Sequence, residues 1–381
     1  MVTSIAPPPA PLLPDTLLEY LSQILPWAHG HQLKGIATFV AAILERQTGN
    51  QAELARGSGN QEAAVKRLAR LIHNVRLAPH ILAEATLAQA LRQLPRYGPI
   101  RISIDWTIED DQHLLVVSLG IGGRAVPIFW RAYHQSVLKG RMHRYELAVI
   151  RRALTRLFCQ VGPRRVRVTA DRGFADDGLF ALLQGLGVPF VIRVKGNVQI
   201  RVDQQWRKLN TLRFSGNTRR HSFGQVEYCE SHPRRLWVTT SRARNKQEKW
   251  ETWYLVSNRP YRAGLAANEY ARRFGCEEGF RDAKRLLGFV DARITDIAAW
   301  SRMFALFAWA LWVMVSLGTK LLGTHTTRAL GLLRRVASRR QDRCELSLPT
   351  ATLKLLQQDK SLWAFLVPVR LDLEAHLPNV S

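Results

Sequence analysis

Hydrophobic residues in the first quarter of the chain recur at intervals of three and four, which is the spacing of one buried face of an α-helix. No alternation of the kind expected for a β-strand interrupts this pattern. Asn60, just before one of the segments, is a favoured helix cap. We therefore predict a helical N-terminal domain over residues 1–98. Its helical segments are Leu17–Ile24, Ile36–Leu44, Ala63–Ile72 and Ile81–Leu94.

The pattern changes to a period of two from residue 99 onward. Ile102 and Ile104 then share one face of a strand, with Ser103 and Asp105 on the other. Two more strands follow, and then a helix, a strand, a helix and a fifth strand as far as residue 194. Three consecutive strands followed by alternating helices and strands indicate a mixed sheet covered by helices. The predicted fold class is therefore mixed α/β, with residues 99–194 as the first part of its core.

Residues 195–262 combine short alternating runs with 15 Lys and Arg against 5 Asp and Glu, which predicts a small antiparallel β-rich insertion. Helical character resumes over 263–322, the second part of the core. Its segment Met303–Thr319 has no charged residue. Because a membrane-spanning helix needs about 20 apolar residues, we predict a buried core helix instead. The sequence pattern of the C-terminal region, 323–381, does not predict a role for it.

The charge narrows the choice of partner. The 381 residues include 55 Lys and Arg against 30 Asp and Glu, a formal net charge of +25. A charge of this size favours a polyanion, with DNA or RNA first and an anionic membrane surface as the alternative. Lys66, Arg67 and Arg70 share one side of a predicted helix, either as a DNA-facing surface of the N-terminal domain or as an ordinary solvated face.

The cysteines and histidines do not indicate a metal site. Four scattered cysteines have no zinc-binding spacing and suit a reducing compartment, and the histidines form no HExxH pattern. The N-terminal peptide MVTSIAPPPAPLLPD lacks a basic start and is interrupted by prolines, so no signal peptide is predicted. We expect a cytoplasmic protein.

Two aspartates lie where predicted strands give way to loops. Asp105 is at the polar end of the first strand, and Asp171 follows the fourth. If these strands are neighbours, the two carboxylates come together, and a pair of this kind suits a hard divalent cation such as Mg²⁺. A turn or capping role is the alternative for either aspartate taken alone, as for Asp176 and Asp177.

A third carboxylate is expected from the helix that contains YARRFGCEEGFRDAKR. On a helical wheel Tyr270, Arg273, Glu277 and Lys284 form one polar stripe about 60° wide, whereas Glu278 falls well off it. An adjacent apolar stripe can pack on the sheet. We therefore expect Glu277 to join the two aspartates. The alternative is an exposed helix with i,i+4 ion pairs between Glu277 and its arginine neighbours.

The spacing Tyr270-x2-Arg273-x3-Glu277-x6-Lys284 resembles the YREK signature of IS4-family DDE transposases at all four positions. DWT, which begins at Asp105, and DRGF, which begins at Asp171, resemble the family's segments around its first two acids. The resemblance covers about residues 99–320 and is weaker for the N-terminal helices. It implies a ribonuclease H-like catalytic core carrying a β-rich insertion.

The resemblance also implies roles for individual residues. Asp105, Asp171 and Glu277 would be the catalytic acids and would hold two Mg²⁺ or Mn²⁺ ions. Tyr270, Arg273 and Lys284 would bind DNA phosphates near the element's end. Trp253 would stack on a flipped base, and the alternative is a strand residue with its ring in a core. The insertion contains three further tryptophans, which are Trp206, Trp237 and Trp250.

We therefore expect an insertion-sequence transposase that binds terminal inverted repeats and cuts and joins double-stranded DNA, with a hairpin intermediate as in relatives. The partners implied by the resemblance are transposon ends, target DNA and a second copy of the chain in a synaptic complex, without a membrane, at the bacterial nucleoid. The alternatives are a metal-dependent nuclease of the same fold, a non-catalytic protein that binds DNA ends, and a basic RNA-binding or membrane-surface protein.

Overall fold

The N-terminal segment is helical, as predicted. The computed structural model describes residues 15–56, 59–212, 219–244, 249–323, 347–371 and 373. Expectations for the N-terminal peptide and for part of residues 323–381 lie outside these ranges. The Asn60 side chain accepts a hydrogen bond from the Ala63 amide, which confirms the predicted helix cap. The helices are α1 (Asp15–Ile24), α2 (Gly30–Arg46), α3 (Gln51–Ala55), α4 (Gln61–Ile72) and α5 (Pro79–Gln93).

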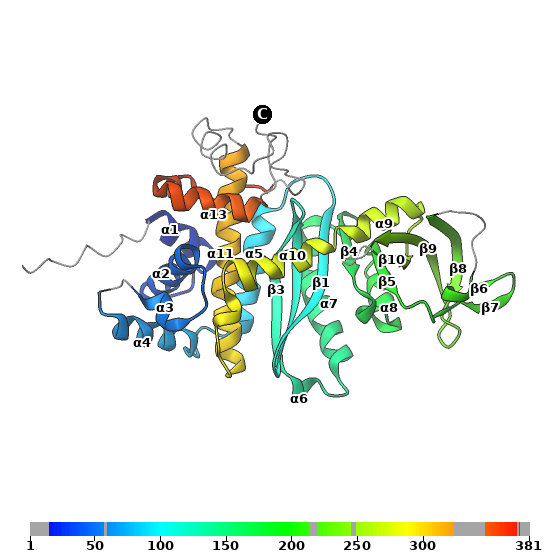
Figure 1. Ribbon diagram of the computed structural model, residues 1–381, viewed down its shortest axis with the longest axis horizontal. Helices are drawn as coiled ribbons and strands as arrows, with labels where there is room; N and C mark the ends of the chain where they lie inside the picture. The colour runs from blue at the N-terminus through cyan, green and yellow to red at the C-terminus, as the bar shows by residue number, and fades with distance from the viewer. Residues whose placement is uncertain are drawn as a thin grey trace, which may run out of the picture.

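A ten-stranded mixed sheet extends from the middle of the molecule to its right-hand end in Figure 1, in the order β3-β2-β1-β4-β5-β10-β9-β8-β6-β7. In its first half, β1, β2 and β3 form an antiparallel meander, whereas β4 and β5 run parallel to β1. This half confirms the predicted order of strands and helices. Its strands are β1 (Ile100–Glu109), β2 (Gln112–Ile121), β3 (Arg124–His134), β4 (Val166–Ala170) and β5 (Phe190–Val194).

The second half of the sheet comes from the predicted insertion. Its strands are antiparallel, as expected, but β10 also pairs with β5, so they continue the central sheet instead of forming a region of their own. Alternation along a strand shows which residues share a face, but it does not show which strand will pair with it. The sequence therefore did not indicate that β10 pairs with β5 and extends the central sheet. The strands are β6 (Gln199–Val202), β7 (Gln205–Lys208), β8 (Arg220–Tyr228), β9 (Arg234–Arg244) and β10 (Trp250–Ser257).

Helices cover both faces of the first half. The Trp106 indole of β1 donates to Glu146 of α7 (Met142–Val161), so α7 covers one face, and α8 (Asp177–Gly185) packs beside it. Ser103 points to the opposite face and hydrogen-bonds to Cys276 of α10 (Phe274–Arg281). Because side chains alternate along a strand, Asp105 shares the α10 face with Ser103.

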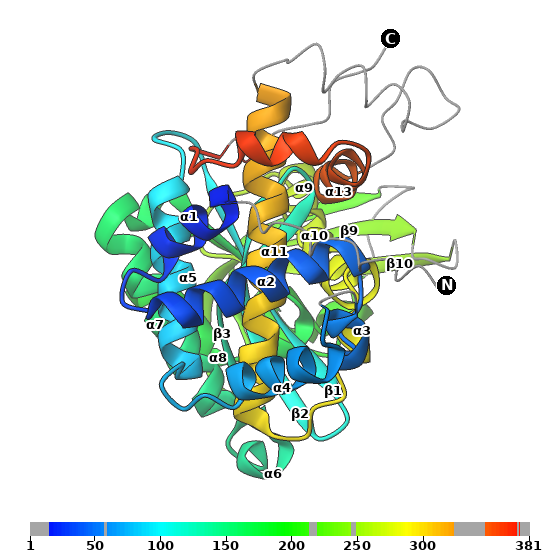
Figure 2. The same ribbon diagram turned by 90° about the vertical axis from the view of Figure 1, so that its left-hand side faces the viewer.

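The apolar segment is a core helix, α11 (Ile297–Gly323), which α2, α4 and α5 surround (Figure 2). Its stretch Ile297–Leu321 is long and apolar enough to span a membrane, but 89% of its most apolar window is buried. Polar groups anchor it: the Trp309 indole donates to Thr86, and Arg302 donates to two backbone carbonyls at the end of α4 and beyond it. The structure therefore confirms the core helix. A further helix, α13 (Leu348–Gln358), packs against it.

Candidate active site

The topology brings the first two acids together. In the parallel pairing of β1 and β4, Ile104 lies opposite Ala170, so the next residue of each strand, Asp105 and Asp171, emerges at the same edge. Asp105 still belongs to β1, and Asp171 is the first residue after β4. The expectation that these strands are neighbours is confirmed.

The third acid comes from a helix that is not continuous. A single helix was expected from Tyr270 to Leu287, but α9 (Ala263–Ala271) ends before α10 begins at Phe274, and a π-helical turn follows at Asp282–Leu286. The expected single helix is therefore wrong. The amide of Leu287 bonds the carbonyl of Asp282 five residues earlier, which adds a residue to that turn. The helical wheel could not include either break, because both depend on what the segment packs against.

Two glycines allow α10 to lie directly on the sheet. Gly275 and Gly279 are four residues apart and therefore share one face of the helix. A Cβ atom at Gly279 would lie 2.0 Å from the Ala125 carbonyl oxygen of β3, and one at Gly275 would lie 3.0 Å from the Gly123 carbonyl oxygen. Glycine at both positions thus allows α10 to pack close to the sheet, and this determines the distance of Glu277 from the strands.

Arg273 joins two of the three carboxylates. Its guanidinium donates to Asp105 Oδ2 at 3.0 Å and to Glu277 Oε1 at 3.0 Å. The Tyr270 hydroxyl donates to the third acid, Asp171, at Oδ1, also at 3.0 Å. The i,i+4 ion pair that was the alternative for Glu277 is present, but the same arginine extends it to Asp105. The guanidinium carbon of Arg273 lies 5.8 Å from the Tyr270 ring centroid, so the two hydrogen-bonded sets lie next to each other.

Burial and neighbouring charges shift the pKa values of Asp105 and Asp171 in opposite directions. Burial raises the pKa of Asp105, Arg273 counteracts this, and the neighbouring charges of Asp171 and Glu277 raise it further. Burial also acts to raise the pKa of Asp171, but the Arg172 amide, Arg273 and the Tyr270 hydroxyl outweigh it and hold that pKa below its usual value. Burial and Asp171 raise the pKa of Tyr270 to about 12 against the opposing effect of Arg273 and Arg193, so its hydroxyl keeps its proton near neutral pH.

Lys284 and Glu278 lie at the margins of this site. Lys284 pairs with Glu109 at 2.8 Å, at the end of β1 beyond Asp105. Glu278 instead pairs with Arg124 at 2.9 Å and with Arg281. Glu278 therefore lies apart from the three acids, as its position on the helical wheel predicted, and is ion-paired there.

The donor set suits a hard divalent cation. Asp105, Asp171 and Glu277 offer carboxylate oxygens, the ligands that Mg²⁺ and Mn²⁺ prefer. Burial is the main reason why the pKa of Asp105 is raised, and the charges of Asp171 and Glu277 add to the rise; a cation bound between the carboxylates would offset that repulsion. Arg273 already places positive charge between two of them. The residues therefore fit the metal ions that the sequence implies.

The structure separates two tryptophans of β10. Trp253 is only 8% exposed and packs on Tyr270 and Phe274, with ring centroids 5.2 and 5.7 Å away. Its ring therefore lies in a small core behind the acids. Trp250 is three residues earlier and therefore faces the other side of the strand. It is 45% exposed.

Three arginines lie around Trp250, which its sequence context did not distinguish from the other tryptophans of the insertion. The guanidinium carbons of Arg219, Arg242 and Arg244 lie 5.1, 5.7 and 5.3 Å from its ring centroid, within the range of cation–π contacts. Strand parity along WETWYLVS, together with the arginines of the paired segment, was the signal that could have found this cluster.

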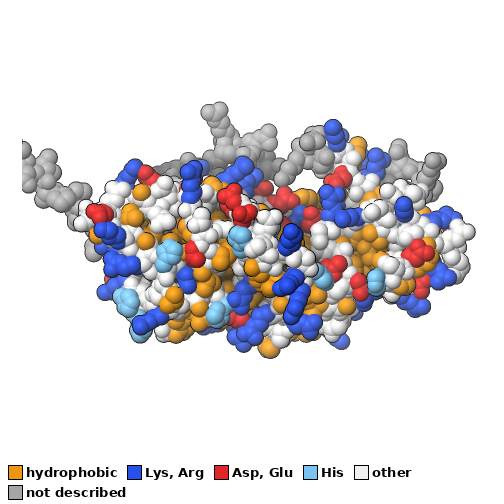
Figure 3. Space-filling view, turned by 90° about the horizontal axis from the view of Figure 1, so that it is seen from below, with side chains coloured by type: hydrophobic (Ala, Val, Ile, Leu, Met, Phe, Trp, Pro, Cys, Tyr) orange, Lys and Arg blue, Asp and Glu red, His pale blue; other side chains and the backbone are white. Residues whose placement is uncertain are grey.

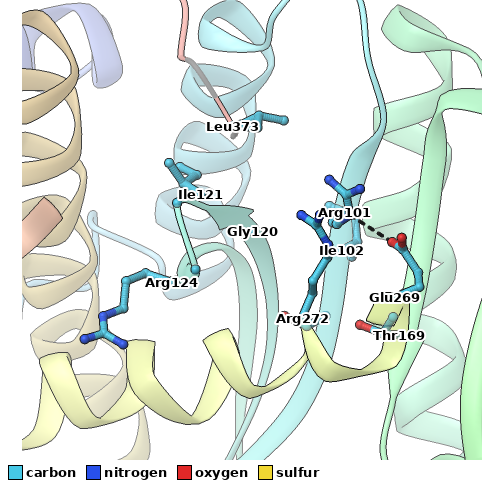
Figure 4. Close-up of a pocket in the computed structure, with 12 residues that line it drawn as sticks. Arg101, Ile102, Gly120, Ile121, Arg124, Thr169, Glu269, Arg272 and Leu373 are labelled. Atoms are coloured by element: carbon cyan, nitrogen blue, oxygen red, sulfur yellow. Dashed lines mark hydrogen bonds and ion pairs between the residues drawn. The ribbon is translucent and has the colours of Figure 1, made fainter. Parts of the chain in front are cut away.

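A second basic feature is a hollow on the α10 face of the sheet (Figure 4). Arg101 and Arg272 lie on one side of it and Arg124 on the other. Glu269 of α9 neutralises part of this charge, since it pairs with Arg101 at 2.9 Å and with Arg167 at 3.3 Å. Basic groups therefore extend from the acids along α9 and α10.

Comparison with known proteins agrees with this geometry. Residues 140–313 match a family model described as a transposase DDE domain. The matched segment includes Asp171 and Glu277 and begins after Asp105. No curated protein matches the chain. Together with the converging acids, the match supports a DDE transposase.

Proposed function

We propose that the protein is an insertion-sequence transposase of the IS4 type, which binds terminal inverted repeats and catalyses metal-dependent DNA cleavage and strand transfer. The observation that carries the proposal is the convergence of Asp105, Asp171 and Glu277 around Arg273 within a chain that matches a transposase DDE domain. Strand order 3-2-1-4-5 with β2 antiparallel supports a ribonuclease H-like core for residues 99–194 and 263–322.

In this proposal the three acids hold two Mg²⁺ or Mn²⁺ ions, which when bound activate the attacking hydroxyl and stabilise the leaving oxygen at phosphorus. Arg273 holds Asp105 and Glu277 in place and neutralises them in the absence of metal. Tyr270 fixes the orientation of Asp171 through its hydroxyl. Tyr270, Arg273 and Lys284 would contact DNA phosphates once the acids turn to the ions.

The wider DNA contact is proposed to follow the basic surface. Figure 3 shows Lys and Arg side chains spread over one whole face of the molecule, with acidic side chains fewer and scattered. On the β-rich half, Trp250 and its three arginines offer an aromatic face beside positive charge, the combination that stacks bases and binds phosphates. Stacking on Trp253 would require the ring to leave its core, so Trp250 is the better candidate.

The remaining parts of the proposal follow from the function. Cleavage at two transposon ends needs two active sites, so we propose a homodimer in a synaptic complex, working at the bacterial nucleoid in the cytoplasm. The helical segment 1–98 is proposed to add DNA contacts, and the hairpin route is proposed for excision. Residues 195–262 would be the DNA-binding insertion, and 323–381 remain without a proposed role.

The test uses a plasmid that carries the inverted repeats of the element. With Mn²⁺ or Mg²⁺ we expect cleaved ends and target-joined product from the unchanged protein. Asp105→Asn and Glu277→Gln should lower cleavage at least 100-fold, because each removes a charged ligand of the ions. Glu278→Gln is the matched control and should retain cleavage. Equal cleavage by all the variants would refute the catalytic assignment.

The same assay separates the main rival. A metal-dependent nuclease of this fold would give nicked or cut DNA without target-joined product. Retention of cleavage with no joined product, over a range of target DNA concentrations, would therefore favour the nuclease.

A further inference from the structure

A cluster of one histidine and two carboxylates lies on the other face of the sheet from the catalytic acids. His143 and Glu146 are three residues apart in the first turns of α7, and Asp176 caps α8. Two short chain segments, at the ends of β1 and β4, connect the cluster to the active site. Trp106, which contacts Glu146, directly follows Asp105, and Asp176 follows Asp171 by one short loop.

The three potential ligand atoms converge. His143 Nδ1 lies 3.0 Å from Asp176 Oδ2 and 3.7 Å from Glu146 Oε2. One ligand atom from each residue lies within 4.8 Å of the others. Ligands of a tetrahedral zinc ion at bond lengths of ~2.0–2.1 Å are separated by ~3.3 Å. The two separations from His143 therefore bracket this value, and all three ligand atoms lie within 4.8 Å of one another.

The second oxygen of each carboxylate is already held by another group. The Trp106 indole donates to Glu146 Oε1 at 2.6 Å, and the Leu179 amide donates to Asp176 Oδ1 at 2.9 Å. Outer hydrogen bonds of this kind orient the ligands of a metal. They leave Glu146 Oε2 and Asp176 Oδ2 turned toward the imidazole.

Two further observations point to a ligand at this position. Glu146 is only 7% exposed, and burial raises the pKa of this carboxyl although the Trp106 indole and His143 oppose the rise. The imidazole of His143 lies so close to Gly178 that a Cβ there would be 2.6 Å from Nε2. The glycine thus leaves space for the ring. Because the His143 side chain is 47% exposed, solvent can supply a fourth ligand.

We propose that His143, Glu146 and Asp176 bind a Zn²⁺ ion that is distinct from the catalytic ions. One imidazole and two carboxylates suit zinc better than magnesium, which prefers oxygen ligands alone. The ion would join the start of α7 to the start of α8, next to the ends of β1 and β4. It would thereby fix the loop that carries Asp171 relative to Asp105. This positioning role rests on the proposed function, whereas the metal site does not.

The experiment measures Zn²⁺ and Co²⁺ binding to the full chain carrying Asp105→Asn and Glu277→Gln, which removes two of the catalytic ligands. Equilibrium dialysis should give about one Zn²⁺ per chain, and Co²⁺ should produce the visible absorption of a tetrahedral N,O site. Adding His143→Ala should remove both signals. Adding His80→Ala, an exposed histidine elsewhere, should leave them unchanged.

Asp176→Asn provides a variant that keeps the α8 cap but loses one charged ligand, so it separates metal loss from misfolding. We expect its zinc affinity to fall at least tenfold and its circular dichroism spectrum to be unchanged. Zinc content that is the same with and without His143→Ala would overturn the site. Zinc binding that depends on His143, found together with an unchanged protein that fails to cleave DNA, would leave the site standing and count only against the proposed function.

Discussion

At the scale of single residues, Arg273 is the group around which the acids are arranged. It is 5% exposed, and burial acts to lower its pKa, but Tyr270, Asp105 and Asp171 together raise it above the usual arginine value. The guanidinium therefore stays charged while it bonds two carboxylates. A lysine could not reproduce the two-pronged contact, since its charge is a single point.

The two tryptophans of β10 give opposite expectations. Trp250→Ala should weaken DNA binding roughly tenfold, because base stacking on an aromatic ring contributes ~1–3 kcal/mol. The fold should be unaffected, since the ring is 45% exposed. Trp253→Ala should instead destabilise the protein by ~3–5 kcal/mol, the usual effect of removing a buried aromatic ring. Fluorescence anisotropy with end DNA measures binding, and thermal unfolding measures stability. Unchanged DNA binding by a folded Trp250→Ala variant would exclude Trp250 as a DNA contact.

Asp282 makes stability depend on pH. Burial raises its pKa to about 6 from 3.8, although the Arg124 side chain, 3.1 Å away, opposes the shift. The folded state therefore binds the proton more tightly than the unfolded chain. The resulting stability is present below about pH 4 and is lost as the pH rises through 6.

Asp282→Asn removes this titration. The stability of the variant relative to the unchanged protein should increase by on the order of 2–3 kcal/mol between pH 4 and pH 7, at about 1.4 kcal/mol per pKa unit. Urea unfolding at a series of pH values measures the difference. A difference that does not change over this range would show that Asp282 titrates normally.

At the scale of elements, the seat of α10 on β3 determines where Glu277 lies. Gly279→Ala would place a Cβ 2.0 Å from a backbone oxygen, so the helix must lift. We expect a loss of ~1–3 kcal/mol of stability, as in other overpacked cores. Cleavage should fall by at least as much as the smaller fraction of folded protein explains. Gly185→Ala in α8 is the matched control, because nothing lies within 4 Å of its added Cβ.

The control should be neutral or slightly stabilising, since alanine favours a helix by about 1 kcal/mol over glycine. Thermal unfolding and the plasmid assay are run on both variants. If Gly279→Ala kept the stability and cleavage of the Gly185→Ala control, neither property would depend on close packing of α10 on β3.

At the scale of the whole molecule, the N-terminal helices and the sheet share one core around α11. Tyr20 and Gln93 hydrogen-bond to Ser316, and Thr86 accepts a hydrogen bond from Trp309. A fragment that begins at residue 99 would expose the face of α11 that these helices cover. We expect it to aggregate or to unfold without cooperativity. Cooperative melting of the fragment at the temperature of the full chain would contradict a shared core.

Hydrophobic periodicity predicted most of the helices and strands, and the sequence also indicated the three acids that lie together in the structure. Periods of 3.6 and 2 reflect which side chains of an element must be buried, and this local information located the N-terminal helices, the strand meander and the core helix. Asp105 and Asp171 followed from their places at strand ends, and Glu277 from the resemblance and from helical spacing. Glu278 was separated from Glu277 by the same spacing.

The remaining features depend on packing between segments that are far apart in the sequence. The break between α9 and α10 and the π-helical turn arise where the chain crosses the sheet on Gly275 and Gly279. The pairing of β10 with β5, the burial of Trp253 and the meeting of His143 with Asp176 likewise depend on contacts across many residues. A sequence specifies these contacts only through the folded backbone, because residues far apart along the chain become neighbours only when the whole core has formed.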